Sequence, residues 1–407
     1  MMRLSFFIGL AAAIAALLVL ALLRRNPPPP APAPVAEKPA GKVEVPARPW
    51  STYHGNNGLT GLADPLGADA LAVRWRFLAG AKVEQTPVAE EGRIFVANRR
   101  GEVFGIAVDG QKIWSKQFFE PSKNKPDAKP REESIDAPLA VFQGTLLVAT
   151  ASGSLYALNT ATGEERWHST IEGTFLGTPN YVDGTPGAYL AINQSDASLH
   201  AFDVKTGATL WGTDSIDRCD GSPGVGKDFA VYGSCAAALH VIGTAEKKLL
   251  RSIDIDGDSQ VAGGVAVDGD SVFSGCRSGK LLHANVRTGK IVWINPVAKA
   301  EIFTTPAVNA QWVLAVADDG QVFGVDRATG QTRWTVKPGS KPKSPVIAGD
   351  RVLLSARGTL YVLSLEDGRT LWSGEAGDEI SSPAVAFGLV LVGGDDGAVT
   401  AFGPVPK

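Results

Sequence analysis

The segment Leu155–Trp167, LYALNTATGEERW, is the clearest copy of a pattern that returns along the chain. The segment begins with alternating apolar residues, continues with a Thr-Gly pair, and ends with a short polar run that leads to a tryptophan. Such alternation predicts a half-buried strand, and the Thr-Gly pair predicts a tight turn between two strands. The segment is therefore expected to form a β-hairpin.

Six further segments follow the same pattern. They are VFGIAVDGQKIW ending at Trp114, LHAFDVKTGATLW at Trp211, LHVIGTAEKKLLR at Arg251, LHANVRTGKIVW at Trp293, VFGVDRATGQTRW at Trp334 and LYVLSLEDGRTLW at Trp372. In all but the copy ending at Arg251, a turn glycine precedes the tryptophan at one fixed spacing, so each indole should occupy the same place on its strand. We expect these side chains to pack the seams between neighbouring sheets. The predicted docking residues are Trp75, Trp114, Trp167, Trp211, Trp293, Trp334 and Trp372.

A second hairpin precedes each copy, which makes four strands in a repeat of about 40 residues, the period of a propeller blade. Polar turns between the second and third strands occur near Arg100, Ser152, Asp196, Ala236, Ser278, Asp319, Arg357 and Asp396. The chain is therefore predicted to be an all-β, eight-bladed propeller of four-stranded antiparallel blades. Seven blades are the alternative, if one repeat is degenerate.

The two ends of the repeat array are complementary. Leu71–Leu78, LAVRWRFL, reads as a strand without a hairpin partner, whereas the last repeat, Ser382–Phe402, has only three strands. The N-terminal strand is therefore expected to complete the last blade and close the ring.

The residues before the repeats fall into two parts. Leu4–Leu23 is uncharged and long enough to cross a membrane, so residues 1–25 are expected to be an uncleaved anchor, with a cleaved signal peptide as the alternative. Residues 26–70 are expected to be a Pro/Ala-rich spacer and lead-in loop, followed by the propeller over 71–407. Arg24 and Arg25 favour a cytoplasmic C-terminal domain under the positive-inside rule, against the export argued from the cysteines below.

Several motifs that would carry chemistry are missing from the sequence. It has no H-E-x-x-H, G-x-S-x-G, phosphate loop or C-x-x-C-H. His200, His240 and His283 take one position in three consecutive blades, which are spaced too widely for a shared metal ion, so packing is expected instead. The net charge of −3 and the scattered cations do not favour nucleic-acid binding. No catalytic, cofactor or metal site is predicted.

The hairpin L-Y-A-L-x-x-x-T-G-x-x-x-W resembles the tryptophan-docking repeat of the quinoprotein dehydrogenase-like (PQQ-like repeat) propellers. Within them, residues 71–403 look most like the BamB family of outer-membrane protein assembly factors, which implies eight blades and no cofactor. The lipidated cysteine of that family is absent, because no Cys precedes Cys219. The vicinal Cys-Cys pair of the quinone-dependent enzymes is also absent, which makes a PQQ-dependent dehydrogenase the less favoured interpretation.

The three cysteines bear on the compartment. Counting outward from a turn at Gly226-Lys227-Asp228 places Val225 opposite Phe229 and Cys219 opposite Cys235, within disulfide range. A Cys219–Cys235 disulfide is therefore predicted, with two small buried thiols as the alternative. A disulfide would imply an exported domain.

The predicted function is that of a non-catalytic, protein-binding scaffold in the periplasm, held by a single span in the inner membrane. Because strands alternate in direction, the loops between blades and the turns between second and third strands should share one face. The charged insertion Glu120–Glu133 belongs to this face, where the predicted interface residues are Arg99, Arg100, Asp196, Arg277, Asp318, Asp319, Arg357, Asp395 and Asp396. Both charge signs suit an envelope protein or protein complex as partner. An exported ligand-binding or sensor propeller is the alternative.

Overall fold

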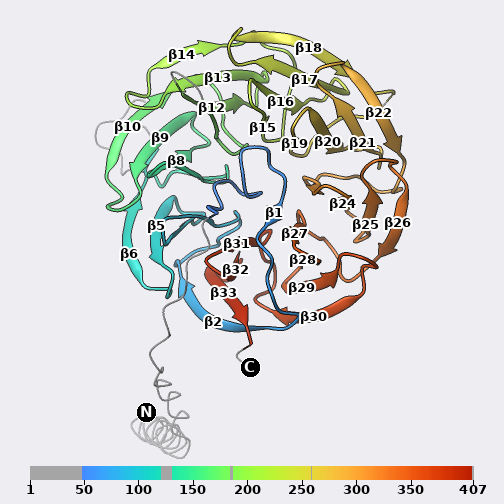
Figure 1. The fold of residues 1–407 in the computed structure, drawn as a ribbon. Coiled ribbons are helices and arrows are strands. Elements are labelled where there is room, and N and C mark those ends of the chain that lie inside the picture. The colour runs from blue at the N-terminus through green and yellow to red at the C-terminus, as the bar shows by residue number, and fades with distance from the viewer. Residues whose placement is uncertain (1–47, 121–130, 184–186, 258, 406–407) are drawn as a thin grey trace, which may run out of the picture. The chain divides into compact units, whose positions relative to one another are not determined.

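The computed structural model describes residues 48–405, apart from 121–130, 184–186 and 258. Eight β-sheets stand around a central axis like the blades of a propeller (Figure 1). Within each blade the four main strands are antiparallel and run outward from the axis in chain order, except where the ring closes; the short β1 (Leu62–Ala63) adds to one blade in parallel. The predicted all-β, eight-bladed propeller is therefore confirmed, and the seven-bladed alternative is wrong.

The first four blades follow one another without exchange of strands. Blade 1 is β3 (Val88–Glu90), β4 (Arg93–Ala97), β5 (Glu102–Ala107) and β6 (Lys112–Gln117); blade 2 is β7 (Ala140–Phe142), β8 (Thr145–Ala149), β9 (Ser154–Asn159) and β10 (Glu165–Thr170). Blade 3 is β11 (Asn180–Val182), β12 (Ala188–Asn193), β13 (Ser198–Asp203) and β14 (Thr209–Gly212); blade 4 is β15 (Gly224–Val225), β16 (Phe229–Gly233), β17 (Ala238–Gly243) and β18 (Lys248–Asp254).

The last four blades bring in both ends of the described chain. Blade 5 is β19 (Ala266–Asp268), β20 (Ser271–Gly275), β21 (Leu281–Asn285) and β22 (Lys290–Asn295); blade 6 is β23 (Ala307–Val308), β24 (Trp312–Val316), β25 (Val322–Asp326) and β26 (Thr332–Val336). Blade 7 is β27 (Val346–Ala348), β28 (Arg351–Ala356), β29 (Thr359–Ser364) and β30 (Thr370–Glu375), with β1 (Leu62–Ala63) added to β27. Blade 8 is β31 (Ala384–Ala386), β32 (Leu389–Gly393), β33 (Ala398–Pro404) and β2 (Leu71–Leu78).

Burial falls from the axis to the rim. In blade 2, β7 and β8 are buried at every residue, whereas β10 buries only Trp167. A strand packed between two neighbouring sheets must be apolar on both faces, and TLLVA of β8 meets that requirement. The outermost strand of a blade pairs with another strand on one edge only and is partly exposed to solvent, so polar residues can occupy it.

The ring is closed by strands from opposite ends of the sequence. β2 pairs antiparallel with β33 from Leu71↔Pro404 to Leu78↔Ala398. The indole of Trp75 then reaches blade 1, where its Nε1 donates to Val108 O at 2.7 Å. The N-terminal strand thus completes blade 8 in the way that the sequence predicts.

Tryptophans on the outer strands join one blade to the next. Five of them donate an indole N–H to a carbonyl in the following blade and lay the ring on that blade's turn glycine. The pairs are Trp75 with Gly110, Trp114 with Gly163, Trp167 with Gly207, Trp293 with Gly330 and Trp334 with Gly368. Each of these glycines has positive φ, and a Cβ there would fall within 3.0 Å of the indole. Glycine is required at these turns for both reasons.

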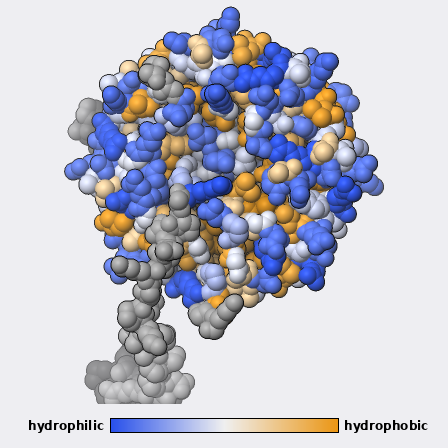
Figure 2. All heavy atoms as spheres, in the orientation of Figure 1, coloured by the Kyte–Doolittle hydropathy of each residue, from blue (hydrophilic) through white to orange (hydrophobic). Residues whose placement is uncertain are grey.

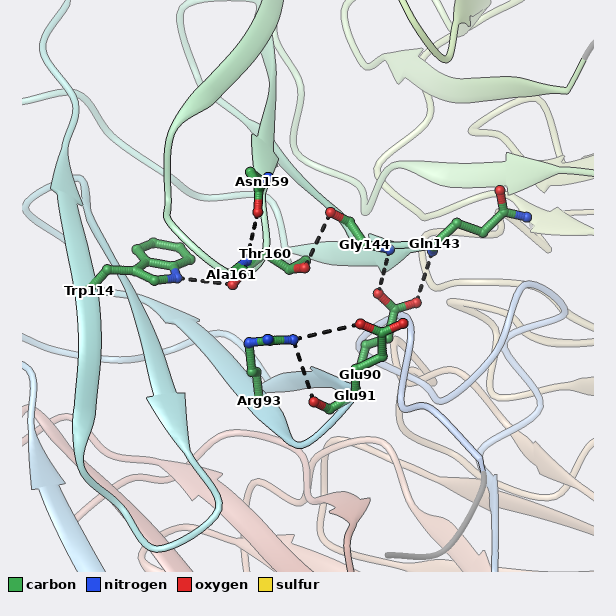
Figure 3. A network of polar contacts seen from close by, with 9 residues as sticks. All are labelled: Glu90, Glu91, Arg93, Trp114, Gln143, Gly144, Asn159, Thr160 and Ala161. Carbon is green, nitrogen blue, oxygen red and sulfur yellow. Dashed lines mark hydrogen bonds and ion pairs between the residues drawn. The ribbon is translucent and has the colours of Figure 1, made fainter.

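The seam between blades 1 and 2 shows how polar contacts extend this docking inward (Figure 3). Trp114 Nε1 donates to Thr160 O at 3.0 Å, and Thr160 Oγ1 donates to Gly144 O at 3.2 Å. The Glu90 carboxylate accepts hydrogen bonds from the backbone N–H groups of Gln143 and Gly144, both at 2.8 Å. The two blades are therefore held together from the rim towards the axis.

The seams on both sides of blade 4 lack this arrangement. Lys247, with φ of 58°, replaces the turn glycine, and Arg251 replaces the tryptophan and packs against Gly289 of blade 5. Within the described residues, the indoles of Trp211 and Trp372 make no hydrogen bond to a neighbouring blade. The turn facing Trp211 contains Lys247, and blade 8 has no third-to-fourth-strand turn for Trp372, because β2 arrives from elsewhere in the chain.

Residues 50–63, which we call the strap, run around the axis at the ends of the first strands. Strap carbonyls accept the backbone N–H groups of Ala89, Val141, Val225, Val267, Val308 and Ile347, from six different blades, at 2.6–2.9 Å. In blade 3, the side chain of Asn57 donates to Tyr181 O at 2.8 Å. The strap crosses the centre of the ring in Figure 1, and Figure 2 shows hydrophobic residues near that centre within a mostly hydrophilic surround.

Among the residues that the structure describes, no helix has the length and apolar character needed to span a membrane. The predicted membrane span, Leu4–Leu23, lies outside the described residues.

Replacing Leu71–Leu78 with a glycine-serine segment of equal length should open the ring. Blade 8 would lose its outer strand, and the contact of Trp75 with blade 1 would be lost as well. Unpaired strand edges would then be exposed, so the protein should aggregate. Size-exclusion chromatography and thermal melting test this result. The same replacement at residues 26–33 serves as the control, and a monomeric variant with an unchanged melting curve would contradict the role of β2.

Trp334→Ala should lower the free energy of unfolding by about 3–5 kcal/mol, because it leaves a cavity where the buried indole packs and removes the hydrogen bond to Leu365 O. Trp211→Ala is the matched control and should cost less, since its indole is more exposed and makes no such bond. Urea unfolding followed by circular dichroism measures both values. Equal losses would show that the turn glycine and indole bond do not determine the strength of a seam.

Candidate functional site

A cavity of about 490 Å³ lies on the axis at the face formed by the loops between blades. Residues from all eight blades line it, and most of them come from the segments that lead into the first strands. Five carboxylates contribute to its wall: Glu84, Asp136, Asp220, Glu379 and Asp395. Lys343 is the only Lys or Arg among the described residues that line it. The cavity wall is therefore predominantly acidic.

The floor of this cavity is Tyr53, which belongs to the strap. Its hydroxyl is hydrogen-bonded to Thr305 Oγ1, and burial raises the pKa of Tyr53 to about 12. The next strap residue, His54, has one ring nitrogen 2.7 Å from Leu59 O and the other 2.8 Å from Pro345 O. These contacts anchor the strap below the cavity, so the cavity ends at the strap.

Two arginines border the acidic wall. Arg99 Nε lies 2.7 Å from Glu84 Oε2, and its Nη1 pairs with Asp136. Arg277 lies 3.9 Å from both Asp220 and Glu301, and its guanidinium stacks over Phe303 at 4.8 Å. Three of the wall carboxylates, Glu84, Asp136 and Asp220, are thus paired with arginines.

The predicted interface residues all lie in turns between second and third strands, but their contacts differ. Arg99, Arg277 and Asp395 border or line the cavity. Asp196, Asp319 and Asp396 accept backbone N–H groups within their own turns, and Asp396 also pairs with Arg76. Arg100 lies 3.7 Å from Glu132, Asp318 N donates to Glu301 O, and Arg357 Nε donates to Ser340 Oγ.

Part of the predicted insertion lies within the described residues. Glu120 N donates to Arg131 O at 2.8 Å, and Glu133 is buried, where it accepts Ser152 Oγ at 2.6 Å. Residues 121–130, which make up most of the insertion, lie outside the described residues. The base of the insertion is therefore tied to the turn between β8 and β9.

Sequence reasoning missed the wall carboxylates. Glu84, Asp220 and Glu379 stand two or three residues before the Ser/Thr-Pro pairs that open the first strands, and Asp136 stands two before Pro138. Repetition of an acidic residue at this place was the available signal. The predicted interface residues come only from the turns between second and third strands, although the loops between blades are expected on the same face.

The cysteines are placed differently from the prediction. β15 pairs with β16 through Val225↔Ala230, not Val225↔Phe229, because the turn contains two residues and not three. Further from the turn, Cys235 N donates to Arg218 O at 3.0 Å, so Cys235 is bonded to the residue before Cys219. Cys219, Cys235 and Cys276 are free thiols in this structure. The disulfide stays a prediction.

The three equivalent histidines occupy third strands in neighbouring blades. His200 is bonded to Ser198 Oγ at 2.9 Å, and His240 lies between Ser234 Oγ and Ser252 Oγ at 2.7 and 2.9 Å. The His283 ring stacks on Phe273 with centroids 4.4 Å apart, and burial, with Arg327 nearby, lowers its pKa to about 4. Each ring is engaged within its own blade.

A sequence model of the family described as outer membrane protein assembly factor BamB matches residues 122–218, 195–375 and 324–404. BamB from Shewanella oneidensis is 27% identical over 274 residues, which cover 61% of this chain and 65% of that protein. BamB from Xanthomonas campestris pv. campestris is 23% identical over 340 residues, 79% of this chain and 81% of that protein.

The crystal structure of BamB from Moraxella catarrhalis superposes with a TM-score of 0.68 at 18% identity, covering 82% of this chain and all of that one. Identity at this level supports the fold alone. The family match is independent of it and extends over well more than half of the sequence. The chain therefore belongs to the family of the outer membrane protein assembly factor BamB.

Proposed function

We propose that this protein is a non-catalytic scaffold of the cell envelope that binds protein partners in outer-membrane protein assembly. The family match carries the proposal, because the relatives are named as assembly factors. The partner would be an envelope protein or protein complex. Leu4–Leu23 would hold the chain in the inner membrane by a single span, with the propeller in the periplasm.

The face with the acidic cavity is the proposed binding surface. It combines an inner wall of carboxylates with surrounding arginines such as Arg99 and Arg277, so both charge signs are presented over a broad area. Charge patterns of this kind determine orientation and partner choice in protein complexes more than they determine raw affinity. A protein surface with complementary charges would match this pattern better than a polyanion would.

An exported ligand-binding or sensor propeller is the second candidate. The axial cavity favours it, because a volume of about 490 Å³ that ends at Tyr53 could admit a small cationic molecule. Substitutions in the cavity wall and substitutions in the surrounding face, made separately, distinguish the two candidates by which kind of binding each set abolishes. Small-molecule binding would depend on Asp220 and Glu379, whereas protein capture would depend on the outer charges as well.

Reversing four charges of the face should release the partner without unfolding the protein. The substitutions are Arg99→Glu, Arg100→Glu, Asp318→Lys and Asp319→Lys. Affinity purification of the full-length protein from membranes, followed by mass spectrometry, should lose the envelope proteins that co-purify with the unaltered chain, because like charges then face one another.

Four exposed charges in turns between third and fourth strands or on a neighbouring outer strand provide the matched control: Asp109→Lys, Lys205→Glu, Lys248→Glu and Glu366→Lys. Retention of the partner by the first variant and its loss by the control would contradict the assignment of the face. Oxidation of alcohols after addition of pyrroloquinoline quinone and calcium would contradict a non-catalytic function.

Thiol titration in denaturant, on protein recovered from its native compartment, should find one reactive thiol and not three. Export would supply the oxidising environment in which Cys219 and Cys235 form a disulfide. Cys276→Ser should then leave no reactive thiol. Three thiols in the unaltered protein would remove the cysteine argument for export.

A further inference from the structure

Among the residues that the structure describes, the strap gives no hydrogen-bond partner to the first strand of one blade. In seven blades the axis-facing polar groups of the first strand are satisfied: six N–H groups bond strap carbonyls, and Tyr181 N bonds the Asn180 side chain. The strap begins at blade 1 and departs from the ring beside blade 7, where β1 pairs with β27. In the described part of the chain, it makes no backbone hydrogen bond to β31 of blade 8.

Val385 is the corresponding residue of blade 8. It pairs with Val390 just as Ala89 pairs with Ile94 in blade 1 and Ile347 with Val352 in blade 7, each time one residue before the turn. Alternate residues of an antiparallel strand direct their N–H groups to opposite sides. The Val385 N–H therefore points to the axis, and it has no acceptor among the described residues.

A second unused donor lies beside it. Trp50 is 2% exposed, and its indole Nε1 has no hydrogen-bond partner within the described part of the chain. Trp50 and Val385 both line a pocket of about 430 Å³ between the strap and blade 8, together with Leu62, Leu66 and Phe387. Buried N–H groups in proteins are nearly always paired, so two unused donors at one pocket call for an acceptor.

The mouth of the pocket carries charge. Arg48 lies 3.6 Å from Asp64 with its side chain 71% exposed, and both residues border the pocket. The rest of the lining combines aliphatic and aromatic side chains with the polar residues Ser51, Asn56 and Asn57. An extended peptide presents apolar side chains together with backbone donors and acceptors, so it could pack against the apolar part of this lining and also accept a hydrogen bond.

We propose that this pocket binds an extended peptide segment with small apolar side chains, and that a backbone carbonyl of the segment accepts the Val385 N–H. The strap supplies the same contact to six other blades, so the bound segment would continue an interface that the fold already uses. The site is at the opposite end of the axis from the acidic cavity, and it is independent of the function proposed for that face.

Nuclear magnetic resonance of the full-length protein in detergent tests the proposal, with acetyl-Ala-Val-Ala-Val-Ala-amide as the probe. Without peptide, the Val385 amide should exchange with solvent at least about 100-fold faster than the Ile347 amide, which is bonded to the strap. Addition of the peptide should slow exchange at Val385 and shift the Trp50 indole signal downfield. The Ile347 amide should not change.

Two variants remove the donors separately. Val385→Pro should fold, because its N–H takes part in no bond to a described residue, and should abolish the response to peptide; Ile347→Pro is its control and should destabilise the ring by removing a strap bond. Trp50→Phe keeps the ring and should weaken peptide binding about tenfold. It provides the test if the proline variant does not fold.

Three results would overturn the proposal. They are equal protection of the Val385 and Ile347 amides in the free protein, absence of any peptide effect on Val385 and Trp50, and an equal effect from acetate at the same concentration. The last result would identify the site as one for small carboxylates and not for peptides.

Discussion

The pairing of β2 with β33 is the interaction on which the rest of the structure depends. A propeller blade buries both of its faces only when it has a neighbour on each side, so an open ring would expose the apolar faces of two blades. The closing strands come from opposite ends of the fold, and no local contact can replace them. Closure therefore couples all eight seams, although each seam is built from local contacts between adjacent blades.

The strap gives the ring two unlike faces. Tyr53 ends the axial cavity from below, while the carbonyls of the strap satisfy the first strands on the other side. One face is thus left with an acidic cavity bordered by Arg99 and Arg277, and the other is covered by the chain's own backbone. The family to which the chain belongs is named for assembly of outer-membrane proteins, and a face with mixed charge is suited to binding a protein.

Blade 4 departs from the regular pattern. Lys247 and Arg251 remove the glycine and the tryptophan from its docking contacts, yet β15 to β18 still form a complete sheet. The hydrogen-bond ladder and the buried residues of the inner strands are therefore sufficient for a blade. Indole docking adds strength to a seam and does not specify the fold of the blade itself.

The sequence alone determined the architecture, because strand periodicity and the fixed glycine-to-tryptophan spacing are local properties that repeat. It also indicated closure by Leu71–Leu78, since a strand without a hairpin partner can supply the fourth strand that the last repeat lacks. It did not predict the register of the hairpin that follows Cys219. A difference of one residue in the length of a turn changes which side chains lie opposite one another. Nor did the sequence predict the strap or the acidic cavity, because both join residues far apart in the chain. Only the tertiary structure brings Tyr53 to Thr305 or leaves Val385 without an acceptor among the described residues.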